Sequence, residues 1–203
     1  MLKKPTLKLG FLASNAGTSM RAIVAAIEAG ELAAEARLLV SNRREASALI
    51  FAAEHGVAAR VIPTASDPDA ADAALAAALR GAGVELVILS GYLRKLGPKT
   101  LSAYRGRILN IHPALLPKFG GPGMYGRRVH EAVAASGDPV TGVTVHLVDE
   151  EYDHGPPLAA LEIPLTAGDD AATIEAKVTA AEPAFFVAVL KRLCDGTLTL
   201  PAG

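Results

Sequence analysis

The sequence predicts an α/β protein with a doubly wound, mostly parallel sheet and helices on both faces, a Rossmann-like arrangement. Two observations lead to this prediction. Short apolar segments alternate with segments of helical period over residues 7–110, as in successive βαβ units. In addition, residues 86–89 are apolar at every position, which is typical of a parallel strand covered on both faces. We expect right-handed crossovers between these strands.

Local signals justify each element before Pro113. In chain order we expect strand 7–13, helix 20–29, strand 36–40, helix 45–55, strand 59–62, helix 67–81, strand 85–89, helix 98–104 and strand 107–110. The strands are short and apolar, whereas the helices carry apolar residues at helical spacing. Gly30 and Gly56 follow the first two helices, as helix stops do, and Asp67 or Pro68 can begin the third.

The pattern changes after Pro113, where a glycine-rich loop occupies residues 118–126. The remaining expected elements are helix 127–135, strand 142–148, strand 158–165 and the long amphipathic helix 171–193. Residues 142–148 alternate small or polar with apolar side chains, as an edge strand or a late strand does. Since the chain shows no repeat, no low-complexity segment and no linker, we expect residues 1–203 to form a single domain.

The composition excludes several classes of protein. Of the 203 residues, 51% are hydrophobic and 20% are charged, which supports a packed core rather than disorder. The net charge of -1 argues against a general nucleic-acid or membrane-surface binder. Cys194 is the only cysteine, and no apolar run approaches the roughly 20 residues of a membrane span. We therefore expect a cytoplasmic protein.

Residues 110–113, with the sequence Asn-Ile-His-Pro, form the most informative motif. Asn110 and His112 are two positions apart, so an extended backbone points both side chains to one face. Pro113 ends the strand and places the pair at its carboxyl end, where open α/β sheets bind ligands. An amide and an imidazole there can stabilise an oxyanion and manage protons in acyl transfer. A lone histidine is often a core residue, but two polar groups at a buried strand end favour a function.

A turn of small polar residues, Ser14–Ser19, links the first expected strand to the first helix. Amide groups at a helix N-terminus favour an anion, above all a phosphate group. Gly17 allows a close approach of the backbone, and Thr18 and Ser19 add hydroxyl donors. Because the turn has neither a GxGxxG pattern nor a P-loop pattern, a capped turn without a ligand stays open as an alternative.

The second unusual segment is 144–156, where a strand leads into an acidic loop. Asp153 is a candidate to orient His112 and keep its imidazole charged, although neighbouring carboxylates more often form a solvated loop. Asp153, His146 and His154 are also candidate metal ligands. Since neither an HxxxH nor an HExxH spacing occurs, we expect no metal site.

The loop 90–96 follows the fourth expected strand. Its backbone can meet a flat heterocycle, with Leu93 and Leu96 as apolar walls, or it is an ordinary strand-to-helix turn. His55 and His130 fall on expected helices and are interpreted as structural or solvent-facing. A hydrolase of the Ser/His/Asp type has no support, because the sequence contains no GxSxG motif.

Several motifs occur in a single order along the chain. They are Ser14–Ser19, Gly91–Leu96, Asn110–Phe119 and Val145–His146 followed by Asp153–Pro156. This set resembles the phosphoribosylglycinamide formyltransferases, the folate-dependent formyl transferases of purine synthesis, from about Leu7 to the C-terminal helix. The related methionyl-tRNA formyltransferases and formyltetrahydrofolate deformylases carry an extra domain, for which this chain has no room. The loop 120–126 also looks like the purine branch.

The resemblance implies a role for each candidate residue. Asn110, His112 and Asp153 are the implied catalytic residues. The implied binding residues for 10-formyltetrahydrofolate are Leu93, Arg94, Lys95, Leu96 and Asn110. Those for the phosphate of the ribonucleotide are Ala16, Gly17 and Thr18. Glu182 is implied to hold the amine of the ribonucleotide, and Lys177 to assist near the phosphate. Pro68, Pro157 and Ala160 depart from the family pattern in the region that grips the folate tail.

The implied reaction is transfer of a formyl group from 10-formyltetrahydrofolate to the amine of glycinamide ribonucleotide, without a covalent enzyme intermediate. Two alternatives remain. The same residues can hydrolyse formyl-folate with water as the nucleophile, or the chain can be a non-enzymatic mononucleotide-binding module. We expect small-molecule partners, no nucleic acid and no membrane, and either a monomer or a homodimer.

Overall fold

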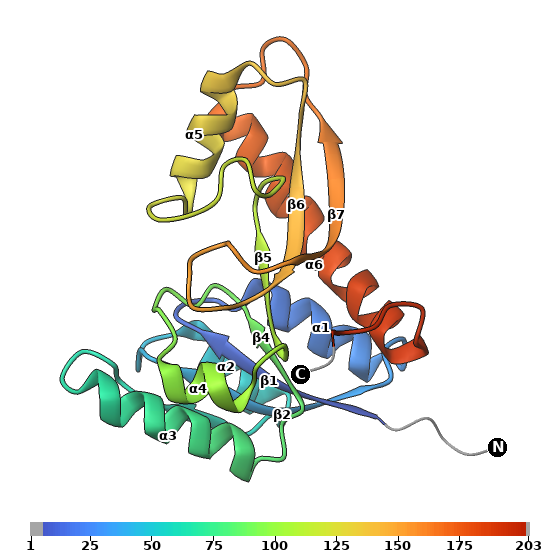
Figure 1. Ribbon diagram of the computed structural model, residues 1–203. Coiled ribbons are helices and arrows are strands. Elements are labelled where there is room, and N and C mark those ends of the chain that lie inside the picture. The colour runs from blue at the N-terminus through green and yellow to red at the C-terminus, as the bar shows by residue number, and fades with distance from the viewer. Residues whose placement is uncertain (1–5, 202–203) are drawn as a thin grey trace.

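The computed structural model describes residues 6–201 (Figure 1). Within this range, the sheet has seven strands in the order β3-β2-β1-β4-β5-β6-β7. The strands are β1 (Leu7–Ala13), β2 (Ala34–Ser41), β3 (Ala59–Val61), β4 (Leu86–Leu89), β5 (Ile108–His112), β6 (Val140–Leu147) and β7 (Pro157–Pro164). The helices are α1 (Thr18–Glu28), α2 (Ser47–Glu54), α3 (Pro68–Gly81), α4 (Pro98–Ala103), α5 (Arg127–Ser136) and α6 (Ala171–Asp195). The predicted α/β class is confirmed.

The sheet is mostly parallel, as predicted. Strands β1 to β5 pair in parallel, whereas β6 runs antiparallel to both β5 and β7. Strand β6, which corresponds to the expected strand 142–148, is therefore a late strand in the interior of the sheet, and β7 occupies the edge. Pairing on both sides buries nearly all of β6.

Two boundaries differ from the prediction in a way that matters for the site. Strand β5 continues to His112 instead of ending at Asn110, because β6 pairs with it as far as the His112–Thr144 pair. Helix α1 begins at Thr18, since Gly17 adopts a left-handed conformation (φ 63°) that turns the chain and its carbonyl accepts the Arg21 amide.

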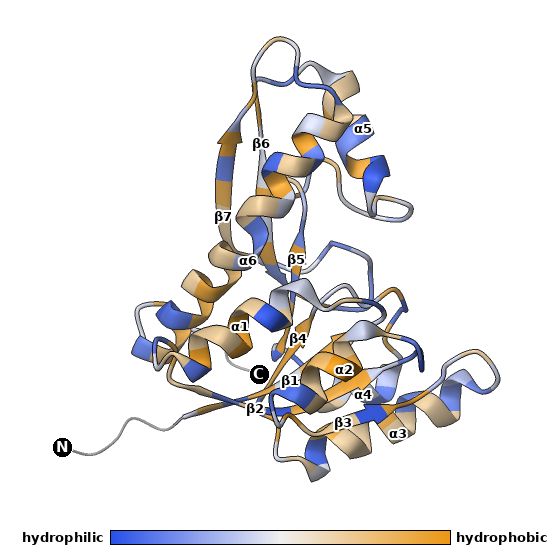
Figure 2. Cartoon of the chain, turned by 180° about the vertical axis from the view of Figure 1, so that it is seen from behind, coloured by the Kyte–Doolittle hydropathy of each residue, from blue (hydrophilic) through white to orange (hydrophobic). Residues whose placement is uncertain are grey.

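Alternate residues of the central strands pack on opposite faces of the sheet. Leu86 and Ile88 of β4 lie in a core with α1, α2 and the C-terminal half of α6, whereas Val87 and Leu89 lie in a second core with α3. Figure 2 shows the hydrophobic residues of the strands enclosed between these helices. This double covering explains why β4 is apolar throughout.

Helix α6 joins two parts of the molecule. Its first half packs through Ile174 and Val178 on α5 and β6, and its second half packs through Phe186 in the core beneath α1. Figure 1 shows α5, β6 and β7 standing above the layers formed by α1 to α4, with α6 running past both parts. Among residues 6–201, no helix has the length and apolar character required to cross a membrane.

Candidate active site

A cleft of about 770 Å³ opens at the carboxyl ends of β1, β4 and β5. The strand order reverses between β1 and β4, because the chain passes from β1 outward to β2 and β3 and then returns to β4 on the other side. Open α/β sheets bind ligands at such a point. Of the residues singled out from the sequence, the cleft is lined by Ala16, Gly17, Thr18, Leu93, Arg94, Asn110, His112, Asp153 and Glu182.

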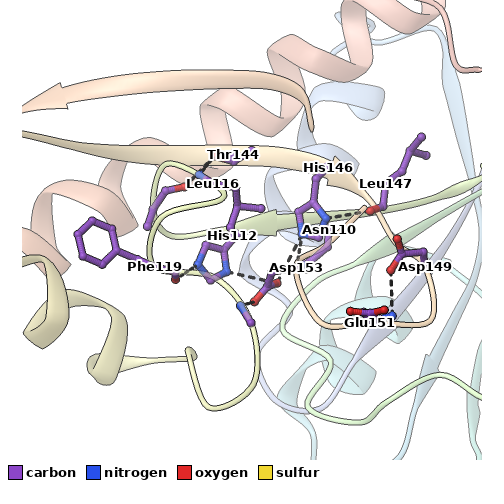
Figure 3. Close-up of polar contacts among 12 residues, drawn as sticks. Asn110, His112, Leu116, Phe119, Thr144, His146, Leu147, Asp149, Glu151 and Asp153 are labelled. Carbon is purple, nitrogen blue, oxygen red and sulfur yellow. Dashed lines mark hydrogen bonds and ion pairs between the residues drawn. The ribbon is translucent and has the colours of Figure 1, made fainter. Parts of the chain in front are cut away.

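Strand β5 presents Asn110 and His112 to this cleft, as their two-residue spacing predicts. His112 is only 3% exposed. Its Nδ1 lies 3.4 Å from Oδ1 of Asp153, and its Nε2 lies 2.7 Å from the carbonyl oxygen of Phe119 (Figure 3). Both ring nitrogens therefore face acceptors, and the ring can donate to both of them only as the imidazolium.

Asp153 reaches His112 from the loop between β6 and β7, although the two residues are far apart in the sequence. Its Oδ2 accepts a hydrogen bond from the Gly121 amide at 3.1 Å. Burial by itself would raise the pKa of Asp153, but the hydrogen bond and charge of His112, together with the Gly121 amide, outweigh burial and hold that pKa below its ordinary value. Asp153 is therefore a carboxylate at neutral pH.

Two residues of the site have strained backbones. Asp153 (φ 54°) and Phe119 (φ 62°) are the non-glycine residues with positive φ in the described part of the chain, and both contact His112. Such conformations persist only where the surroundings enforce them, and they cluster at functional sites. The strain thus falls on the two groups that hold the imidazole.

His146 is a further member of the site, to which the sequence gave a place in a family motif and, as a separate possibility, a metal-ligand role. It pairs directly with Asn110 across β5 and β6. Its Nδ1 donates to the Leu147 carbonyl at 2.9 Å, so Nε2 is the acceptor and receives a hydrogen bond from Nδ2 of Asn110 at 3.1 Å. Burial lowers the pKa of His146, which keeps the ring neutral. His146 therefore fixes the orientation of the Asn110 amide.

Glu182 approaches the cleft from helix α6. Burial raises the pKa of its carboxyl to about 7, an effect that the charge of His112 partly opposes. Lys177, one turn earlier on α6, forms an ion pair with Asp169 and is not among the residues that line the cleft. The structure therefore brings Glu182, but not Lys177, to the other candidates.

The candidate folate loop is divided between two hollows. Leu93 and Arg94 line the main cleft, whereas Lys95 and Leu96 line a smaller neighbouring hollow of about 100 Å³ that also includes Pro68. The Leu96 side chain is buried in the core against α3. Binding roles for Lys95 and Leu96 therefore stay predictions.

Comparison with known proteins identifies the family of this chain. Residues 7–190 match the family model described as formyl transferase. The "Phosphoribosylglycinamide formyltransferase, chloroplastic" of Vigna unguiculata is 37% identical over 93% of this chain, which spans 61% of that protein's length. The phosphoribosylglycinamide formyltransferase of Escherichia coli strain K12 is 34% identical over 93% of this chain and 88% of its own length.

A solved structure extends the likeness to three dimensions. Glycinamide ribonucleotide transformylase 1 from Symbiobacterium toebii superposes with a TM-score of 0.87 at 32% identity, over 97% of this chain and 92% of that one. The family model covers most of the chain and includes Asn110, His112 and Asp153. The chain therefore belongs to the formyl transferase family.

Proposed function

We propose that this protein transfers the formyl group of 10-formyltetrahydrofolate to the amine of glycinamide ribonucleotide, a step of purine synthesis. The observation that carries the proposal is the convergence of Asn110, His112 and Asp153 in one cleft with the phosphate-type turn at Gly17. A module that only binds a nucleotide needs such a turn, but it has no use for an amide, an imidazole and a carboxylate held together. The phosphoribosylglycinamide formyltransferases among the relatives support the same reaction.

Each substrate has a place in the cleft. The turn at Ala16, Gly17 and Thr18 binds the phosphate of the ribonucleotide through amide groups at the start of α1. Glu182 holds the glycinamide amine, and the backbone of the loop 93–96 holds the pterin ring. With the phosphate and the pterin bound by the neighbouring loops that follow β1 and β4, the amine and the formyl carbon meet near Asn110.

Formyl transfer proceeds by direct attack. The lone pair of the neutral amine forms a bond to the formyl carbon, the bond from that carbon to N10 of the folate breaks, and a proton passes from the attacking nitrogen to N10. The formyl oxygen becomes an oxyanion, which accepts a hydrogen bond from the Asn110 amide and another from Nε2 of His112. Nε2 exchanges the Phe119 carbonyl, its partner in the structure, for this oxygen.

Asp153 has two tasks in this mechanism. Its carboxylate faces Nδ1 of His112 and stabilises the imidazolium while the oxyanion forms. It also assists the proton transfer from the attacking amine to the leaving folate, through water. No residue forms a covalent bond to the substrate.

Lys177 assists near the phosphate in this proposal, which requires it to leave Asp169. We further propose that the protein works in the cytoplasm, as a monomer or a homodimer, on small molecules alone. The single cysteine and the net charge of -1 support this view. Light scattering after size-exclusion chromatography reports the oligomeric state directly.

The test is to incubate the protein with 10-formyltetrahydrofolate in the presence and absence of glycinamide ribonucleotide. We expect equal amounts of tetrahydrofolate and formylated ribonucleotide, formed only when both substrates are present. Release of formate at the same rate without the ribonucleotide would instead identify a hydrolase. Nucleotide binding without turnover of formyl-folate would identify a binding module.

A further inference from the structure

Two buried serine hydroxyls connect the phosphate turn to the loop that follows β4. Ser14 follows β1 and Ser90 follows β4, and their exposed fractions are 1% and 2%. The hydroxyl of Ser14 accepts a hydrogen bond from the Leu93 amide at 2.8 Å. In the opposite direction, the hydroxyl of Ser90 accepts one from the Met20 amide at 2.9 Å. Each loop therefore supplies a hydroxyl to the backbone of the other.

The link through Ser90 replaces a missing helix cap. The N-cap residue of α1 is Gly17, which has no side chain to accept from the first amide groups of the helix. Ser90, which follows the neighbouring strand β4, accepts a hydrogen bond from the amide of Met20, the third residue of the helix. Its hydroxyl thus serves as the cap that Gly17 cannot provide. Thr18 and Ser19, the first two residues of the helix, line the cleft.

The link through Ser14 is oriented by a third residue. The Ser14 hydroxyl donates to Oδ1 of Asn42, the residue directly after β2, at 2.7 Å. Since the hydroxyl proton is committed to Asn42, a lone pair of the same oxygen faces the Leu93 amide. Neither Ser14 nor Asn42 is among the residues that line the cleft. Their effect on a bound substrate must therefore pass through Leu93.

We propose that Ser14, oriented by Asn42, is a positioning residue that holds the pterin loop at a fixed distance from the phosphate turn. The inference rests on the proposed function, in which these two segments bind the two substrates. Their separation sets the gap between the amine and the formyl carbon. Because a misplacement of about 1 Å can cost about a hundredfold in rate, a buried tie between the two binding segments has a direct effect on turnover.

Kinetics of three variants test this proposal. We expect Ser14→Ala to raise the KM for formyl-folate about tenfold and to lower kcat severalfold, with a smaller change in the KM for the ribonucleotide, because Ser90 still holds the turn. Asn42→Ala should have a smaller effect of the same kind. In the Ser14→Ala background, Asn42→Ala should change kcat/KM less than twofold, since Asn42 acts only through Ser14.

The matched control is Ser136→Ala, which removes a hydroxyl that also donates once and accepts once, at the end of α5 and away from the cleft. Its kinetic constants should equal those of the unmodified protein. Ser14→Ala kinetic constants within twofold of the unmodified protein for both substrates would overturn the proposal, as would additive effects of Ser14→Ala and Asn42→Ala. If Ser14→Ala does not fold, Asn42→Ala takes its place: a raised KM for formyl-folate supports the proposal, and an unchanged KM overturns it.

Hydrogen exchange of the Leu93 amide separates this inference from the proposed function. Ser14→Ala should accelerate the exchange of that amide in the protein without substrates, and Ser136→Ala should not. An unmodified protein that shows no formyl transfer would overturn the proposed function, whereas unchanged exchange at Leu93 would overturn the tie itself.

Discussion

At the scale of single residues, the site depends on how each polar side chain is satisfied. The Asn110 amide gives one N–H to the neutral ring of His146, so its second N–H remains for the cleft. His112 is held between a carboxylate and a backbone carbonyl. Such fixed donors cost no reorganisation when charge develops on a substrate, which is the main source of oxyanion stabilisation in enzymes.

Replacement of Asn110 by alanine tests this role. We expect kcat to fall on the order of a hundredfold or more, because the loss of an oxyanion donor has that effect in other enzymes. Steady-state kinetics with both substrates measures the change, and a thermal melt of the same sample shows that the variant is folded. Near-normal turnover in a folded variant would remove Asn110 from the mechanism.

Glu182 makes a prediction about stability and pH. Because burial raises its pKa from 4.5 to about 7, the carboxyl of the unfolded chain loses its proton at a lower pH than that of the folded chain. The free energy of unfolding therefore decreases as the pH rises from about 4.5 to about 7. Above that range it is lower by about 3 kcal/mol because of Glu182. We expect Glu182→Gln, without substrates, to be more stable than the unmodified protein at pH 8 by up to this amount, and similar at pH 4.

Denaturant unfolding of both proteins at the two pH values checks this expectation. If the stability difference between Glu182→Gln and the unmodified protein is the same at pH 4 and at pH 8, Glu182 does not titrate with a raised pKa. Since the same carboxylate holds the amine in the proposed mechanism, the variant should also raise the KM for the ribonucleotide.

At the scale of elements, two glycines allow strand β6 and the following loop to approach their neighbours. A Cβ on Gly142 would overlap the Leu161 carbonyl oxygen of β7 and would lie 2.6 Å from the Leu115 side chain. A Cβ on Gly155 would overlap the carbonyl oxygen of Leu147. The loop that carries Asp153 can therefore close against the end of β6 only with glycine at position 155.

The prediction for this element is that Gly142→Ala destabilises the protein by about 1–3 kcal/mol or more, because backbone atoms must move to admit the methyl group. Gly81→Ala is the control, since its Cβ would meet no atom within 4 Å at the end of α3. That change should stabilise by about 0.5–1 kcal/mol. Urea unfolding of both variants measures the two effects, and equal stabilities would contradict the account of β6.

At the scale of the whole molecule, helix α6 joins the part around α5 and β6 to the part around α1. The cleft takes residues from both parts, with Gly17 and Leu93 on one side and Asp153 and Glu182 on the other. A helix that is shared between the two parts keeps these walls together. That residues 1–203 form one domain stays a prediction.

One domain should unfold in a single step. We expect far-ultraviolet circular dichroism and tyrosine fluorescence to give coincident urea transitions, because neither part can keep its core when α6 leaves. Both substrates together should shift the transition to higher urea. A ligand at a hundred times its dissociation constant raises the free energy of unfolding by about 2.7 kcal/mol. Two separate transitions would show that the parts fold independently.

The order of the elements and the position of the Asn110–His112 pair could be predicted from the sequence. The local signals were the hydrophobic period and the residues Gly30, Gly56 and Pro113. Such signals depend only on neighbouring residues, so they can be recognised without knowledge of the fold. The spacing of Asn110 and His112 likewise placed both on one face of a strand end. The motifs of the formyl transferases then identified the family, because their order along the chain is itself a sequence property.

Which distant groups meet could be learned only from the fold. The contact of Asp153 with His112, the pairing of His146 with Asn110 and the tie from Ser14 to Leu93 all join residues that are remote in sequence. Lys177 illustrates the converse, since the resemblance to the family implied a substrate ligand while the fold supplied Asp169 as its partner. Partners of this kind are selected by strand order and by loop closure, which depend on packing over the whole sheet.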